Sequence, residues 1–248
     1  MSLVLSLAVL LAPTAAPTDT IRIEVGSPEV NASWFRPHRA RVRVHLNSLD
    51  TPPTNEWTNE LTIGDSAGRQ VARWVTLGQF DSAGVPGFDL RQTFDHRTLA
   101  PMGYQLRTRA GADVSLAIDG NRVRGTRKLP NNPAVEQVDQ VIPRMGFILS
   151  ASDLVPLAMK FAAGQVVVAP VWAPNMPTAE SRVFHTVGKV SHLVEGKEWD
   201  AWRVDEYRES DGRLMATWYL VEESPYMVGG EVFLPNGNVQ KMTEIALP

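Results

Sequence analysis

The stretch Glu198–Leu247, EWDAWRVDEYRESDGRLMATWYLVEESPYMVGGEVFLPNGNVQKMTEIAL, decides the fold class of this chain. It predicts four consecutive strands, because runs of alternating residues are separated by turn formers at Ser210-Asp211-Gly212, Glu222–Pro225 and Pro235-Asn236-Gly237. Asn-Gly is the strongest of these signals, since both residues accept the positive φ angles of a tight hairpin turn. The second run, Leu214–Val221, is apolar on both faces, which predicts a central strand covered on two sides.

The same pattern of short strands and turns extends over most of the chain and predicts an all-β meander. Further strands are expected at Thr20–Val25, Ala40–Leu46, Leu61–Ile63, Val71–Leu77, Phe88–Phe94, Met102–Arg109, Ala112–Ile118, Arg122–Lys128, Gln165–Val171 and Arg182–Val190. One helix is expected over Ser152–Ala163, where apolar residues share a face and Asp153 or Ser152 can cap the start. The proline-bearing break Leu129–Pro133 suggests halves at 17–130 and 140–248 within a single β domain spanning 17–248.

Composition excludes several classes of protein. The net charge of −3 gives no reason to expect a nucleic-acid partner or a membrane surface. The chain has no cysteine, which excludes disulfides, thiol catalysis and cysteine zinc sites. Beyond the N-terminal segment, no run is long and apolar enough to predict a membrane span.

The first 16 residues resemble a secretory signal peptide. Leu3–Ala12 is almost wholly apolar, and the small residues Pro13–Ala16 precede a polar start at Thr18, although no Lys or Arg stands ahead of the apolar run. We therefore expect a signal peptide at 1–16 and export to the periplasm or the extracellular space, with a soluble protein after cleavage.

The sequence Gly64-Asp65-Ser66-Ala67-Gly68 fits G-x-S-x-G and resembles the nucleophile elbow of the hormone-sensitive-lipase group of α/β-hydrolases. In that motif a strand leads through the serine into a helix, whereas Arg69–Leu77 has the alternation of a strand, so a hairpin is favoured. Asp81-Ser82-Ala83-Gly84 repeats the same four residues, which indicates a turn that the chain uses twice. A helix after Gly68 would favour a hydrolase that uses Ser66 with a histidine such as His96 or His185.

No other catalytic, metal or cofactor motif is evident. The five histidines form no H-x-H or H-x-x-x-H pair, so no metal site is predicted, and there is no phosphate loop or dinucleotide fingerprint, so no cofactor is expected. The adjacent carboxylates Asp205-Glu206 and Glu222-Glu223 should point to opposite faces of a strand, so neither pair is expected to converge on a substrate.

Seven tryptophans are many for this length, and aromatic side chains can line a concave apolar pocket in a curved sheet or fill an ordinary core. Trp34, Trp57 and Trp172 lie in or beside expected loops and are candidates for the rim of a pocket. The ligand-binding candidates are Trp34, Trp57, Trp172, Leu154, Leu157, Phe161 and Trp218.

Four stretches resemble the DUF3108-type families of exported bacterial β proteins. They are FDHRTLAPMGYQLRT (Phe94–Thr108), VSLAIDGNRVRG (Val114–Gly125), LVPLAMKFAAGQVVVAPV (Leu154–Val171) and WDAWRVDEYRESDGRLMATWYLVEESPYMV (Trp199–Val228). The resemblance implies a large, curved antiparallel sheet or open half-barrel, similar to lipoprotein carriers, with one short helix packed against it. It supplies no active-site residues.

Three functions follow as alternatives. The favoured one is an exported non-enzymatic protein that binds an apolar ligand, such as a lipid, or a peptide strand in the concave face of the sheet. The others are a serine hydrolase or esterase using Ser66, and a structural envelope scaffold with a filled core. The ligand and the oligomeric state are not predicted by any feature of the sequence.

Overall fold

A computed structural model describes residues 20–79, 85–130 and 132–248. The expected signal peptide at 1–16 and the second Asp-Ser-Ala-Gly at 81–84 lie outside the described residues. No helix in the described ranges combines the length and the apolar character that a membrane crossing requires.

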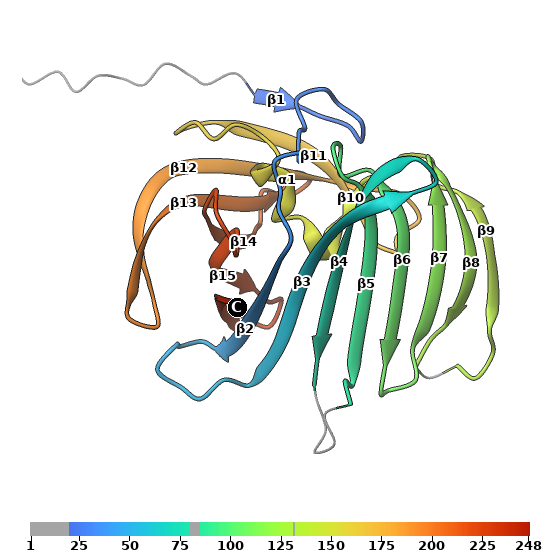
Figure 1. The fold of residues 1–248 in the computed structure, drawn as a ribbon, viewed down its shortest axis with the longest axis horizontal. Helices are drawn as coiled ribbons and strands as arrows, with labels where there is room; N and C mark the ends of the chain where they lie inside the picture. The colour runs from blue at the N-terminus through green and yellow to red at the C-terminus, as the bar shows by residue number, and fades with distance from the viewer. Residues whose placement is uncertain (1–19, 80–84, 131) are drawn as a thin grey trace, which may run out of the picture.

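The predicted all-β fold is confirmed: the described strands form one large curved sheet, and a single short α-helix accompanies it (Figure 1). The N-terminal wall of this sheet is an antiparallel meander in which each strand pairs with the next along the chain. Its strands are β2 (His38–Leu46), β3 (Asn55–Ser66), β4 (Arg69–Gly78), β5 (Phe88–Asp95), β6 (Pro101–Thr108), β7 (Asp113–Asp119), β8 (Arg122–Lys128) and β9 (Glu136–Val141).

The C-terminal wall is a second meander, and it contains the four strands predicted from Glu198–Leu247. Its strands are β11 (Val166–Trp172), β12 (Glu180–Val194), β13 (Lys197–Arg208), β14 (Leu214–Leu220), β15 (Met227–Phe233) and β16 (Val239–Leu247). Strand β16 pairs antiparallel with β2, so the sheet continues without a break from one wall into the other. The short strands β1 (Thr20–Arg22) and β10 (Phe147–Ile148) pair parallel with β11 at its edge.

Both faces of β14 are covered, as its apolar pattern predicted. Leu220 and Trp218 belong to the large core on the concave side, whereas Val221 and Tyr219 pack in a second cluster with Val194. The second face of β14 is covered by the long β12–β13 hairpin. This hairpin reaches as far as β2, where Glu195 at its tip forms a salt bridge with Arg43.

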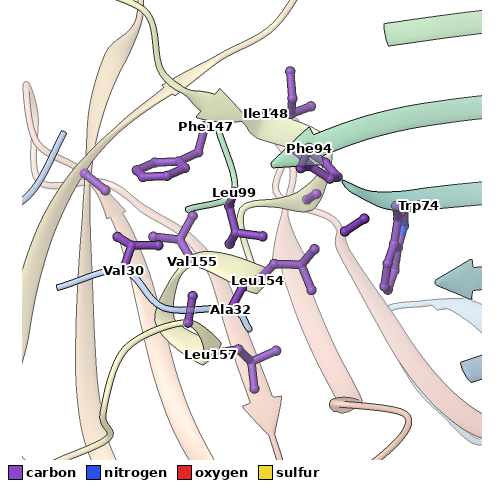
Figure 2. Packing of buried hydrophobic residues seen from close by; sticks show 14 of the residues in the cluster. Val30, Ala32, Trp74, Phe94, Leu99, Phe147, Ile148, Leu154, Val155 and Leu157 are labelled. Atoms are coloured by element: carbon purple, nitrogen blue, oxygen red, sulfur yellow. The ribbon is translucent and has the colours of Figure 1, made fainter. Parts of the chain in front are cut away.

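The chain between the two walls enters the concave side of the sheet, and we call residues 147–158 the plug. It contains β10, a 3₁₀ turn (Leu149–Ala151) and the helix α1 (Leu154–Leu157). Figure 1 shows α1 between the two walls, and Figure 2 shows Leu154, Val155 and Leu157 packed among residues from distant parts of the chain, including Val30, Leu99 and Phe94.

The helix prediction was right in place and wrong in length. Helical spacing over Ser152–Ala163 suggested three turns, but α1 has four residues. Backbone N–H and C=O groups of a segment buried beside a sheet need hydrogen-bond partners. After Ala158 the chain continues in turns toward β11, so the helix ends there. Phe161 therefore lies beyond the helix and stacks on Trp202, with ring centroids 5.3 Å apart.

Replacing the most deeply buried leucine of the plug should destabilise the fold strongly. Leu157 is fully buried, so Leu157→Ala should lower the free energy of unfolding by about 2–5 kcal/mol through lost burial and a residual cavity. The same substitution at Leu193, which is 63% exposed, should change it by less than about 0.5 kcal/mol. Urea unfolding followed by tryptophan fluorescence measures both, and equal small effects would show that the plug does not stabilise the sheet.

Candidate functional site

Two adjoining cavities lie on the concave face of the sheet. The first, which we call the tryptophan cavity, has a volume of about 290 Å³ and contains Trp57 of β3, Trp74 of β4 and Trp218 of β14 in its wall. These residues meet because residues two apart on a strand share a face, and the inward face of β3 continues through paired positions onto β4. The remaining apolar lining comes from Phe88, Leu90, Met227 and Met242.

The second cavity, which we call the leucine cavity, has a volume of about 470 Å³. Tyr104 and Leu106 of β6 line it together with Val114 of β7 and Leu129. Gln79 and Phe88 line both cavities, so the two spaces meet at these residues. Both cavities are largely apolar, and their volumes are comparable with those of ligand sites.

The polar end of the tryptophan cavity is formed by the plug and by a band of buried polar residues across the sheet. Asp153 and Ser150 of the plug line the cavity, as do Asn59 of β3 and Thr76 of β4. Thr76 Oγ1 donates a hydrogen bond to Asn59 Oδ1 at 2.9 Å, and Gln92 Nε2 donates one to Ser150 Oγ at 2.6 Å. The plug is thus fastened to the sheet beside the cavity.

Glu206 is the best-satisfied buried carboxylate of this group. Its Oε2 accepts hydrogen bonds from Trp218 Nε1 at 2.9 Å and Ser152 Oγ at 3.2 Å, and Arg182 lies 3.4 Å from Oε1. Arg182 also forms a salt bridge with Glu180, so its charge is shared between two carboxylates. Burial still outweighs these partners and raises the pKa of Glu206 above its ordinary value.

Glu244 is almost completely buried and has weaker support. Asn59 Nδ2 lies 3.5 Å from its Oε2, at the limit of a hydrogen bond, and its Oε1 has no hydrogen-bond partner among the described residues. Burial, followed by the nearby negative charge of Asp153, raises the pKa of Glu244 well above its ordinary value.

Asp153 completes a group of three carboxylates. Burial raises its pKa to about 7, the charge of Glu206 adds to this effect, and backbone N–H groups of Asp153 and Leu154 oppose it. Within the described ranges, no lysine or arginine forms a salt bridge with Asp153, and none lines the tryptophan cavity. The cavity therefore has an acidic end without a matching positive charge.

The sequence-predicted ligand residues fall into different places. Trp57 and Trp218 line the tryptophan cavity. Leu154 and Leu157 point into the packed interior and are fully buried. The remaining three, Trp34, Trp172 and Phe161, line neither cavity.

The expected position of Trp172 at a pocket rim is corrected by the structure. Trp172 is fully buried at the end of β11, and its Nε1 donates a hydrogen bond to Met176 O at 3.0 Å, so it is a core residue. Trp34 packs against Phe35 and Tyr226 in an aromatic cluster, with the ring of Tyr226 5.4 Å away.

The sequence pattern missed Trp74, Asp153 and Glu244 as site residues. Asp153 was expected as a helix cap, but its side chain makes no capping hydrogen bond. One sequence signal could have found Glu244 and Glu206: each is an acidic residue on an otherwise apolar face of its strand. Glu244 shares the inward face with Met242, and Glu206 shares it with Val204. Glu206 and Asp205 do point to opposite faces, as predicted, since Asp205 accepts a hydrogen bond from Thr217 and contacts Arg203.

The motif containing Ser66 forms a β-hairpin turn. Strand β3 runs through Gly64, Asp65 and Ser66, the chain turns at Ala67 and Gly68 with positive φ angles, and β4 follows at Arg69. A nucleophile elbow needs a helix after the turn, so the hairpin prediction is confirmed and this structural support for the hydrolase is missing. His96 is buried nearby and its Nδ1 lies 3.3 Å from Gln70 Oε1.

No metal site emerges from the described residues, in which no group of three or more His, Asp or Glu side chains is arranged to hold an ion.

Comparisons with known proteins identify no family and no function for the chain. No family model matches the chain, and no curated protein matches it. Among solved structures, it is similar to a β-barrel-like protein of the domain of unknown function DUF1849 from Brucella abortus, with 10% identity and a TM-score of 0.47 over 85% of this chain and 95% of that one. Since no family model matches, the resemblance to the DUF3108-type families stays a prediction.

Acidic groups whose pKa values are raised in the folded state make stability depend on pH. The pKa of Asp153 rises from 3.8 to about 7, so the folded protein holds more protons than the unfolded chain between these values. The contribution of Asp153 to the free energy of unfolding is therefore fully present below about pH 4 and is lost as the pH rises through 7. The raised pKa values of Glu206 and Glu244 change the free energy of unfolding in the same direction.

We predict that Asp153→Asn shifts the difference in free energy of unfolding between pH 8 and pH 6 in favour of pH 8, because an asparagine cannot ionise. Urea titrations at both pH values measure it. Asp200→Asn is the matched control, because the side chain of Asp200 on β13 is 68% exposed, and it should leave the difference unchanged. A difference between pH 8 and pH 6 that is the same in Asp153→Asn as in wild type would contradict the prediction.

Proposed function

We propose that this protein is a non-enzymatic binding protein that holds an apolar, lipid-like molecule in the concave face of its sheet. The observation that carries the proposal is the pair of adjoining cavities, whose lining is dominated by aromatic and aliphatic side chains. Transfer of apolar surface from water into such a recess is favourable at roughly 25 cal/mol per Å². Two adjoining apolar spaces favour an elongated apolar molecule over a compact polar one.

The alternatives from the sequence have less support. A scaffold with a filled core would have side chains in the concave face, whereas here the space beside the plug is open. A serine hydrolase would need a base beside Ser66, and this serine lies exposed in a hairpin turn. Binding of a peptide strand has no specific observation in its favour.

Export and the DUF3108-type family belong to the same proposal. Export is supported by the signal-peptide pattern of residues 1–16, and a carrier of apolar molecules in an aqueous envelope compartment would need a recess of this kind. The family assignment is supported by the four sequence stretches quoted above and by the single short helix beside a curved sheet.

We expect an apolar molecule to copurify with the protein. Native mass spectrometry of protein purified gently from its own host, followed by solvent extraction, should show a bound species near one to one. Leu106→Trp should prevent uptake from a lipid extract, because the larger ring fills the leucine cavity. Leu193→Trp, the same change at an exposed leucine outside both cavities, should not.

Circular dichroism and cooperative unfolding must show that both variants fold. A clean ligand-free mass, with no uptake from the lipid extract by folded wild-type protein, would overturn the binding proposal and favour the scaffold.

A separate test addresses the hydrolase. We expect no hydrolysis of short-chain nitrophenyl esters above a heat-denatured control, and no change on Ser66→Ala, because Ser66 is exposed on a hairpin turn that a strand follows, not a helix. Hydrolysis that Ser66→Ala abolishes, with the fold intact, would replace the binding proposal by the esterase.

A further inference from the structure

We propose that the ligand is a cationic amphiphile, with its positively charged head group held between the rings of the tryptophan cavity and Asp153, and its apolar chain in the leucine cavity. This inference rests on the proposed function and specifies its ligand class. Three independent features of the described residues support it: the aromatic wall, the uncompensated acidic end, and the apolar extension.

The aromatic wall is suited to a cation. Trp57, Trp74 and Trp218 come from three different strands and line one small space. The face of an indole ring carries partial negative charge and attracts an ammonium group, and tryptophan does this best among the aromatic residues. One tryptophan in a core is ordinary packing. Three tryptophans around an open volume of about 290 Å³ resemble the walls of an ammonium-binding cage.

The carboxyl groups at the end of this cavity have no basic partner of their own among the described residues. Asp153 lines the cavity, Glu206 and Glu244 lie behind it, and Arg182 is the basic side chain that contacts this group. Since Arg182 is divided between Glu206 and Glu180, it leaves Asp153 and Glu244 uncompensated. The unpartnered Oε1 of Glu244 is a second sign of the same deficit.

A bound cation would supply the missing charge. The raised pKa of Asp153 has the cause expected of an acid that is buried without a counter-ion. An ammonium head group beside it would favour the ionised carboxylate, because opposite charges in a partly desolvated site attract more strongly than in water. An anionic head group would meet repulsion from the same residues.

The apolar extension determines where the rest of the ligand lies. The leucine cavity adjoins the tryptophan cavity at Gln79 and Phe88, and its wall contains Leu106, Val114 and Leu129. Arg127 at its edge forms a salt bridge with Glu136 at 2.8 Å, so its charge is already paired. One end of the recess is therefore acidic and aromatic and the other apolar, which matches a molecule with a cationic head and a hydrocarbon chain.

The experiment compares surfactants that share one chain, all below their micelle concentrations. Isothermal titration calorimetry at pH 8 uses dodecyltrimethylammonium, dodecyl maltoside and dodecyl sulfate. We expect the cation to bind at least ~10-fold more tightly than the neutral surfactant, as a desolvated cation–π and carboxylate site would give. The anion should bind most weakly.

Variants and pH locate the effect. Asp153→Asn should bring the ratio of cationic to neutral affinity close to one, and Glu244→Gln should reduce it, whereas Asp200→Asn should leave it unchanged. Because dodecyltrimethylammonium keeps its charge at every pH, its affinity should rise from pH 6 to pH 8 as Asp153, flanked by Glu206, Glu244 and Arg182, loses its proton.

The outcomes separate this inference from the proposed function. Equal binding of all three surfactants, or preference for dodecyl sulfate, would overturn the cationic ligand and leave an apolar binding protein. Failure of folded wild-type protein to bind any of them would overturn both. A preference for the cation that Asp153→Asn leaves intact would also overturn the assignment of the head group to this cavity.

Discussion

The structure depends on the plug being hydrogen-bonded inside the curved sheet. An open sheet has a concave interior that must be filled, and residues 147–158 fill it with apolar side chains on one side and Ser150, Ser152 and Asp153 on the other. Two of these polar residues find partners across the sheet, in Gln92 and Glu206. Each such bond contributes only ~1 kcal/mol, but a buried group left without its partner costs more. The plug therefore supplies hydrogen-bond partners to Gln92 and Glu206, and these residues in turn hold the plug against the sheet.

The two walls of the sheet differ in how their faces are covered. In the C-terminal wall the β12–β13 hairpin covers the outer face, which gives β14 apolar contacts on both sides. The N-terminal wall is a simple meander whose concave face supplies most of the lining of the two cavities. The tryptophan cavity lies where the walls meet, since Trp218 belongs to one and Trp57 and Trp74 to the other.

Much of the architecture could be predicted from the sequence, because strand alternation and turn residues are local signals. The hairpin at Asn236-Gly237 and the turn after Ser66 are examples. The length of α1 could not be, since burial inside the sheet overrides helical spacing in a segment that includes Pro156. Nor could the site: Asp153 and Glu244 are 91 residues apart, and only the path of the plug brings them together. Charge on an apolar strand face was the one local signal.

The acidic end of the tryptophan cavity works against the stability of the fold. A buried polar group without a full set of partners costs stability, so a protein built only to fold has no use for Glu244 beside Asp153. Breaches of such local rules occur mainly at functional sites. Here the acidic residues lie at the cavity that Trp57, Trp74 and Trp218 line. The proposed cationic ligand would account for both features, because its head group would neutralise the carboxyl groups and its atoms would fill the open volume.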